Sequence, residues 1–324
     1  MAAMAAGGLP DFVVARPATG GRGPGARPPR ADNVSGPGAR ELADLAFAAA
    51  RGGAPLTTRP DACADGAGAG GACSSAPAVD LMRAIVPAAA RAPPGAVVRA
   101  AAAALGCPDE ACILTHVAFR DRARAAGVDP GAELETRFKP RGPRVGTELL
   151  SNFDIDAVHA RWAAAFPGHH HCPFAMMDFA SNGDAFGRAD LAALFRGGAS
   201  TFGCVVNTDR SSGPGKHWVA VFADARAPAG APRTVEYFNS AGNPPPAPMV
   251  AWMERQRAAL AEAFGAAEAL AVTDVAHQAS QTECGVYALY YIRRRLEGAP
   301  AAEFAGRLVP DDAMTAFRAH LFRA

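Results

Sequence analysis

Hydrophobic residues along the middle of the chain fall into two kinds of segment. Short runs rich in β-branched and aromatic residues predict β-strands, and they lie at residues 173–179, 201–209, 217–225, 233–241 and 270–276. Recurrence every three to four residues predicts helices, and it covers residues 188–195, 248–264, 284–298 and 311–322. This mixture indicates an α+β domain, with a mixed, mostly antiparallel central sheet packed on helices.

The first third of the chain has a different character. Residues 1–78 are rich in Gly, Pro, Ala, Arg and Ser, so they contain too little apolar surface to offset the entropy of ordering. We expect a low-complexity, largely disordered tail, interrupted by one helical segment at 40–51. Helical spacing then predicts a helical arm over 79–145, broken by prolines. The remaining residues, 146–324, form the predicted catalytic domain, with Ser151 or Asn152 as the cap of its first helix.

Composition excludes several classes of function. The formal net charge is +1, and only Lys139 and Lys216 are lysines among the 32 basic residues, so nothing in the overall charge favours nucleic acid or a membrane as a partner. The N-terminal residues lack the apolar stretch of a signal peptide or membrane anchor, which predicts a soluble protein that is not secreted. The seven cysteines are unevenly spread, and we expect free thiols in a reducing compartment rather than disulfides.

Cys284 is the candidate nucleophile. It lies in QTECGVYALYYI, where a polar loop meets an apolar helix. Unpaired amides and the macrodipole at a helix N-terminus stabilise a thiolate, which is the species that attacks in acyl transfer. Because a buried structural cysteine can occupy the same place, this residue alone does not define an enzyme.

Two further residues complete a candidate triad. His217 opens the strand at 217–225, and Asn239 ends the strand at 233–241, so adjacent strands would hold both at one edge of the sheet. His217 could act as the base, and the Asn239 side-chain oxygen could orient its ring. Glu236 is the competitor for the orienting role, but strand alternation places it on the opposite face from Asn239. A surface histidine and a turn-forming asparagine are the alternatives.

An oxyanion donor is expected in the loop before Cys284. Gln278 lies six residues before Cys284, and its amide hydrogens could stabilise the oxyanion of the tetrahedral intermediate together with the Cys284 backbone amide. Gln281 is the rival for this role.

These motifs together resemble a known family. The segments KHWVAVF, VEYFNSAG and HQASQTECGVYALYYI are similar in order and spacing to those of the adenovirus-type and SUMO-processing cysteine proteases. The segments GCPDEACIL and ELLSNFDIDAVHARW resemble the polyprotein-processing proteases of large cytoplasmic DNA viruses such as African swine fever virus. SUMO proteases mostly carry Asp where this chain has Asn239, which favours the viral branch.

The resemblance implies a cysteine endopeptidase that cleaves after Gly-Gly or Gly-Xaa-Gly, without a cofactor. In that family Trp218 would cover a narrow channel that admits only glycines. The implied substrates are viral core polyproteins, cut during virion maturation in the virion and the host cytoplasm. Two alternatives remain open: a protease that removes SUMO or ubiquitin-like modifiers, and a catalytically idle virion protein of the same fold.

Three other features carry no functional prediction. The run from His169 to Cys172 suggests zinc, but three adjacent histidines cannot all face one ion in a regular element, and no partner pair has finger spacing. Cys107 and Cys112 are too few to form a ligand set, and we expect them to pack. The scattered arginines of the tail at 16–40 are expected to be solvated spacers rather than a nucleic-acid site.

Overall fold

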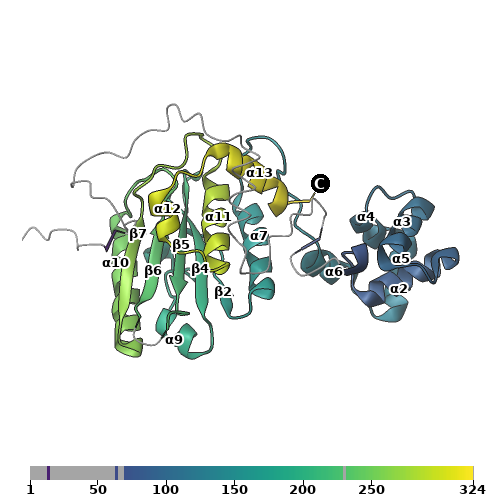
Figure 1. The fold of residues 1–324 in the computed structure, drawn as a ribbon, viewed down its shortest axis with the longest axis horizontal. Coiled ribbons are helices and arrows are strands. Elements are labelled where there is room, and N and C mark those ends of the chain that lie inside the picture. Colours follow the sequence, from purple (N-terminus) through teal and green to yellow (C-terminus); the bar gives the residue numbers. More distant parts are fainter. Residues whose placement is uncertain (1–12, 15–62, 65–68, 229–230, 324) are drawn as a thin grey trace, which may run out of the picture. The chain divides into compact units, whose positions relative to one another are not determined.

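A computed structural model describes residues 13–14, 63–64, 69–228 and 231–323 (Figure 1). Their contacts divide the chain into two compact units. One contains residues 168–311 with the short strand β1, and the other contains residues 63–167 with 312–323. The helices at 152–165 and 311–321 therefore group with the predicted arm. The predicted helical segment at 40–51 and most of the predicted tail lie outside the described residues.

The first unit contains the predicted strands and the nucleophile helix. The strands are β1 (Val13–Val14), β2 (His169–His171), β3 (Ala175–Met176), β4 (Thr201–Asn207), β5 (Trp218–Asp224), β6 (Arg233–Phe238) and β7 (Ala267–Val272). The helices are α8 (Phe179–Asn182), α9 (Leu191–Arg196), α10 (Ala247–Phe264), α11 (Cys284–Leu296) and α12 (Ala302–Gly306). The α+β class and the mixed sheet are confirmed.

The strand order is β1-β7-β6-β5-β4-β2, and β3 also pairs with β4. Among the strands in the described residues, β4–β5 and β5–β6 are antiparallel, whereas β1–β7, β2–β4, β3–β4 and β6–β7 are parallel. The prediction of a mostly antiparallel sheet is therefore wrong. The strands β6 and β7 are parallel because the helix α10 connects them, and a crossover helix returns the chain in the same direction.

Helices cover the two faces of the sheet differently. On one face, α9 and α10 enclose a core that includes Phe186, Phe202 and Trp252. On the other face, α11 packs against β4 and β5, and Phe238 of β6 stacks on Tyr291 of α11 with ring centroids 4.5 Å apart. Every residue of α11 is buried, so this helix is fixed along its whole length.

The second unit is helical. Its elements are η1 (Ala69–Gly71), α2 (Ala76–Ile85), η2 (Pro87–Ala89), α3 (Pro94–Leu105), α4 (Glu110–Thr115), α5 (Val117–Ala126), α6 (Pro130–Arg137), α7 (Asn152–Ala165) and α13 (Asp311–Leu321). Ser151 is the N-cap of α7 and forms a capping box with Asp154. Of the two predicted caps, Ser151 and Asn152, the structure therefore selects Ser151. In this unit, described structure includes residues 63–64 and 69–78, which lie within the predicted tail of residues 1–78.

Two cysteine pairs correct the prediction of free thiols. Cys63 is bonded to Cys73, and Cys107 is bonded to Cys112. The left-handed Gly106 ends α3 and turns the chain so that Cys107 meets the first turn of α4. The Cys63 pair depends on packing against α6, because Cys63 bridges Phe138. The remaining cysteines, which are buried and form no disulfide, are Cys172, Cys204 and Cys284.

Candidate active site

His217 and Asn239 meet at one edge of the sheet. The antiparallel register pairs Ala220 of β5 with Phe238 of β6, so the residue before β5 and the residue after β6 lie at the same edge. The His217 Nε2 atom is 2.8 Å from the Asn239 Oδ1 atom. Asn239 is only 2 % exposed, whereas His217 is half-buried. The structure thus brings together the predicted base and the predicted orienting residue.

The hydrogen bonds around Asn239 fix the tautomer of His217. The Asn239 Oδ1 atom also accepts the backbone N–H of Ala241 at 2.9 Å, and the Asn239 Nδ2 group donates to the Tyr237 hydroxyl at 3.0 Å. Because a backbone N–H can only donate, the oxygen of the amide must face Ala241 and His217. His217 therefore donates through Nε2, and in the neutral ring the lone pair is on Nδ1.

Cys284 begins α11 and is 3 % exposed. Burial raises the pKa of the Cys284 thiol, although backbone hydrogen bonds from Trp218, from Gly285 and from Cys284 itself oppose the rise. The expectation that the helix N-terminus gives this cysteine a lowered pKa is wrong for the free protein, because loss of water outweighs the amides. Because the backbone of Trp218, the residue after His217, contributes to this pKa, the thiol lies near the start of β5.

Burial also lowers the pKa of His217, while the hydrogen bond to Asn239 raises it in part. A raised thiol pKa and a lowered imidazole pKa both favour the uncharged forms. In the substrate-free protein, Cys284 is therefore a thiol and His217 a neutral imidazole, rather than a thiolate and an imidazolium.

Gln278 is held at both ends of its side-chain amide. Its Oε1 atom accepts from the Ser240 hydroxyl at 2.8 Å, and its Nε2 group donates to the Ser280 carbonyl at 3.0 Å. Its backbone N–H donates to the Ser240 carbonyl at 2.9 Å, so the loop before Cys284 is joined to the residue after Asn239. The rival Gln281 is exposed.

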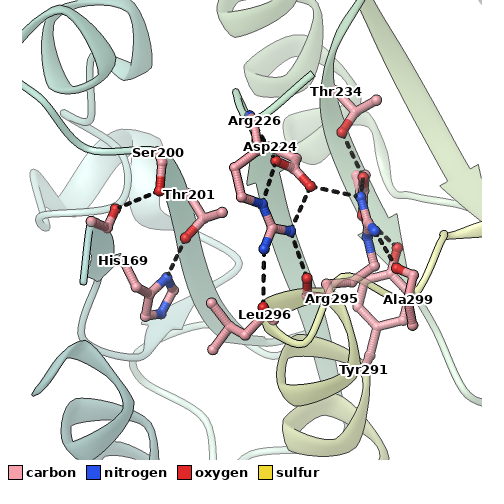
Figure 2. A network of polar contacts seen from close by, with 12 residues as sticks. His169, Ser200, Thr201, Asp224, Arg226, Thr234, Tyr291, Arg295, Leu296 and Ala299 are labelled. Carbon is pink, nitrogen blue, oxygen red and sulfur yellow. Dashed lines mark hydrogen bonds and ion pairs between the residues drawn. The ribbon is translucent and has the colours of Figure 1, made fainter. Parts of the chain in front are cut away.

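Glu236 serves a different network from Asn239. Figure 2 shows the partners of Glu236, which are Thr234, Tyr291 and Arg295, near the place where β5 ends and β6 begins. Arg295 of α11 donates to both carboxylate oxygens of Glu236, at 2.7 and 2.8 Å, and the Tyr291 hydroxyl donates to it at 2.7 Å. The Glu236 side chain is fully buried. As predicted from strand alternation, it is directed away from the candidate triad and toward α11.

Trp218 is 8 % exposed and lies edge-on to Phe174, with ring centroids 6.2 Å apart. Its ring is therefore nearly buried and packs against Phe174. The role of covering a glycine channel stays a prediction.

Further observations concern groups outside the predicted site. Among the residues that the structure describes, no group of three His, Cys, Asp or Glu side chains is arranged to hold a metal ion. Within the same ranges, no helix has both the length and the apolar character of a membrane span. Three residues with contacts to the site were missed from the sequence: Tyr237, Ser240 and Asp311. Ser240 and Asp311 contact partners 38 and 32 residues away, which no local pattern marks. Tyr237 contacts Asn239 two residues further on, so its place on the same strand face was the available signal.

The sequence of this chain is similar to those of known proteins. Residues 205–324 match the family model described as the Ulp1 protease family, C-terminal catalytic domain. The cysteine protease of a tick isolate of African swine fever virus from Malawi is 47% identical over 232 residues, covering 68% of this chain and 84% of the relative. A South African tick isolate of the virus has a relative called a SUMO-1 cysteine protease, which is 46% identical over 232 residues with the same coverage.

Solved structures agree with the sequence relatives. The crystal structure of the African swine fever virus protease matches with a TM-score of 0.69 and 38% identity, covering 82% of this chain and 97% of that one. The chain belongs to the Ulp1-like family of cysteine proteases, in the group that contains the African swine fever virus enzyme. It is a cysteine-type peptidase with the α+β fold of that group.

Proposed function

We propose that this peptidase uses Cys284 as nucleophile, His217 as general base and Asn239 as the residue that orients the imidazole. The observation that supports this most strongly is the hydrogen bond from His217 to Asn239. It lies beside the start of β5, where the Trp218 backbone opposes the rise in the pKa of the Cys284 thiol. With Nε2 bonded to Asn239, Nδ1 is the nitrogen that takes the thiol proton. Proton transfer and attack on the scissile carbonyl then proceed together, because both groups are neutral at rest.

The tetrahedral intermediate places a negative charge on the former carbonyl oxygen. We assign its stabilisation to the Cys284 backbone amide and to the second hydrogen on Gln278 Nε2, since Ser280 takes the first. Collapse expels the amine, which receives its proton from His217, and leaves a thioester on Cys284. Water, deprotonated by His217, then attacks the thioester and releases the acid and the free thiol.

The proposed substrates are proteins cut after Gly-Gly or Gly-Xaa-Gly. The small residues are required if Trp218, whose side chain is nearly buried, covers the channel that leads to the Cys284 sulfur. By similarity to the viral relatives, we propose core or capsid polyproteins as natural substrates and the virion and host cytoplasm as the site of action.

The test is a panel of peptides containing Gly-Gly-Xaa, Gly-Xaa-Gly and Ala-Ala-Xaa, incubated with wild-type protein and with Cys284→Ser. The proposal predicts cleavage after glycine by the wild type only. Cleavage of the Ala-Ala peptides at the same rate would contradict the glycine channel, and an absence of all cleavage would contradict the assigned activity.

A second candidate function is removal of SUMO or ubiquitin-like modifiers, whose C-termini also end in Gly-Gly. The observation that favours it is that the viral relative from the South African isolate is called a SUMO-1 cysteine protease. A modifier with a C-terminal electrophile separates the two: labelling of Cys284 without cleavage of core polyproteins would favour this alternative. The idle-protein alternative requires instead that Cys284→Ser change no activity.

A further inference from the structure

The loop that carries Gln278 is anchored by one carboxylate far along the chain. The Asp311 Oδ2 atom accepts the backbone N–H groups of Ala279 at 3.1 Å and Ser280 at 2.7 Å. Its Oδ1 atom accepts from the Ser280 hydroxyl at 3.3 Å and from the Tyr287 hydroxyl at 3.1 Å. A carboxylate can accept all of these bonds at once, which an amide or an alcohol in its place cannot do.

The same contacts join this loop to the nucleophile helix. Tyr287 lies three residues after Cys284 in α11, and its hydroxyl is also within hydrogen-bond distance of the Val309 carbonyl at 2.9 Å and the His277 carbonyl at 3.3 Å. The loop between residues 277 and 283 is therefore tied at its beginning and its middle to one hydroxyl and one carboxylate.

The position of Ser280 determines where the Gln278 amide points. The Ser280 carbonyl accepts a hydrogen bond from Gln278 Nε2. Because a carbonyl oxygen repels the oxygen of an amide, this contact fixes the orientation of the Gln278 side-chain amide, with its NH2 group toward Ser280. If the Ser280 backbone moved, Gln278 would lose the partner that orients its Nε2 group, although Ser240 would still hold its Oε1 atom.

We infer that Asp311 is a positioning residue for the oxyanion donor: it fixes Ser280, and through Ser280 it fixes the Nε2 group of Gln278. This inference rests on the proposed role of Gln278. Asp311 does not contact substrate; its effect on the rate passes through the loop. A donor held before the reaction begins costs no reorganisation when the oxyanion forms.

The expected kinetic result is a loss that is not additive with Gln278. We expect Gln278→Ala to lower kcat about a hundredfold, as the loss of one oxyanion donor does in other enzymes. Asp311→Asn should lower kcat roughly tenfold with little change in KM, since the misplaced donor still contributes part of the time. The double variant should be no slower than Gln278→Ala. Asp312→Asn, a neighbouring exposed aspartate, is the matched control and should match the wild type.

A second measurement keeps the inference testable without cleavage. Amide hydrogen exchange on the full chain should become at least about tenfold faster at residues 277–283 in Asp311→Asn, but not in Asp312→Asn. The reason is that a neutral amide accepts the backbone N–H groups of Ala279 and Ser280 more weakly than the Asp311 carboxylate does. Unchanged exchange would overturn the anchoring. Additive kinetic losses in the double variant would overturn the route through Gln278. Failure of the proposed function would appear separately, as a wild type that cleaves no peptide.

Discussion

Replacing Glu236 with alanine should unfold the protein more easily without removing its chemistry. Glu236 accepts four hydrogen bonds, from Thr234, from Tyr291 and twice from Arg295, and it is fully buried. Its loss leaves a buried guanidinium without its main partner, which costs about 3–5 kcal/mol. Arg295 keeps an ion pair with Asp224 at 3.2 Å, so we expect the lower value, about 3 kcal/mol.

Thermal unfolding and peptide cleavage measure the two effects separately. A loss of about 3 kcal/mol corresponds to a fall in Tm of roughly 6–12 °C for a domain of 150–250 residues. At a temperature where the variant remains folded, kcat/KM should fall less than about threefold, because the network lies at the opposite edge of the sheet from His217. Glu236→Gln, which keeps the size and part of the bonding, should lose less stability.

Asn239→Ala is the comparison variant for Glu236→Ala. It should lower kcat/KM more than about tenfold, because His217 loses the acceptor that fixes its tautomer. The reasoning would be refuted if Glu236→Ala abolished cleavage while fully folded and Asn239→Ala retained full activity, since Glu236 would then be the orienting residue.

Three further predictions concern other parts of the molecule. The acidic limb of the pH profile of kcat/KM should lie below the usual histidine pKa, because activity requires neutral His217 and burial lowers the pKa of His217. In Asn239→Ala this limb should move to still lower pH, because the variant lacks the hydrogen bond that raises the pKa of His217. Reduction of the Cys63–Cys73 disulfide should destabilise the helical unit by about 2–4 kcal/mol, seen as a lower midpoint in urea with dithiothreitol, whereas an unchanged midpoint would mean that the bond carries no stability. Ser151→Ala should cost about 1 kcal/mol through loss of the α7 cap, with Ser181→Ala as the exposed control.

Much of the fold could be predicted from local patterns. The runs of β-branched and aromatic residues at 201–209, 217–225 and 233–241 identify β4, β5 and β6, and the position of Cys284 at a loop-to-helix boundary identifies the start of α11. Strand pairing could not be read in the same way, because it depends on where each connection returns the chain. The helix between β6 and β7 already favoured a parallel pair.

Part of the candidate site could also be predicted from local patterns. His217 and Asn239 lie at the ends of strands that pair in sequence order, so their meeting follows from local signals. Asp311 contacts a loop about thirty residues away, at Ala279 and Ser280, and no periodicity links such positions. The pKa of Cys284 was also mispredicted, because a helix N-terminus is visible in the sequence while the burial that outweighs it is not.

The most direct test of the central claim is to locate the reactive thiol. A peptide ending in Gly-Gly with a vinyl ester electrophile is incubated with the protein, and the adduct is mapped by mass spectrometry. The account predicts one adduct on Cys284, none in Cys284→Ala, and normal labelling in Cys172→Ala, a control at another free buried cysteine. An adduct that persists in Cys284→Ala, or one found on Cys172 or Cys204, would contradict the assignment of Cys284 as the nucleophile.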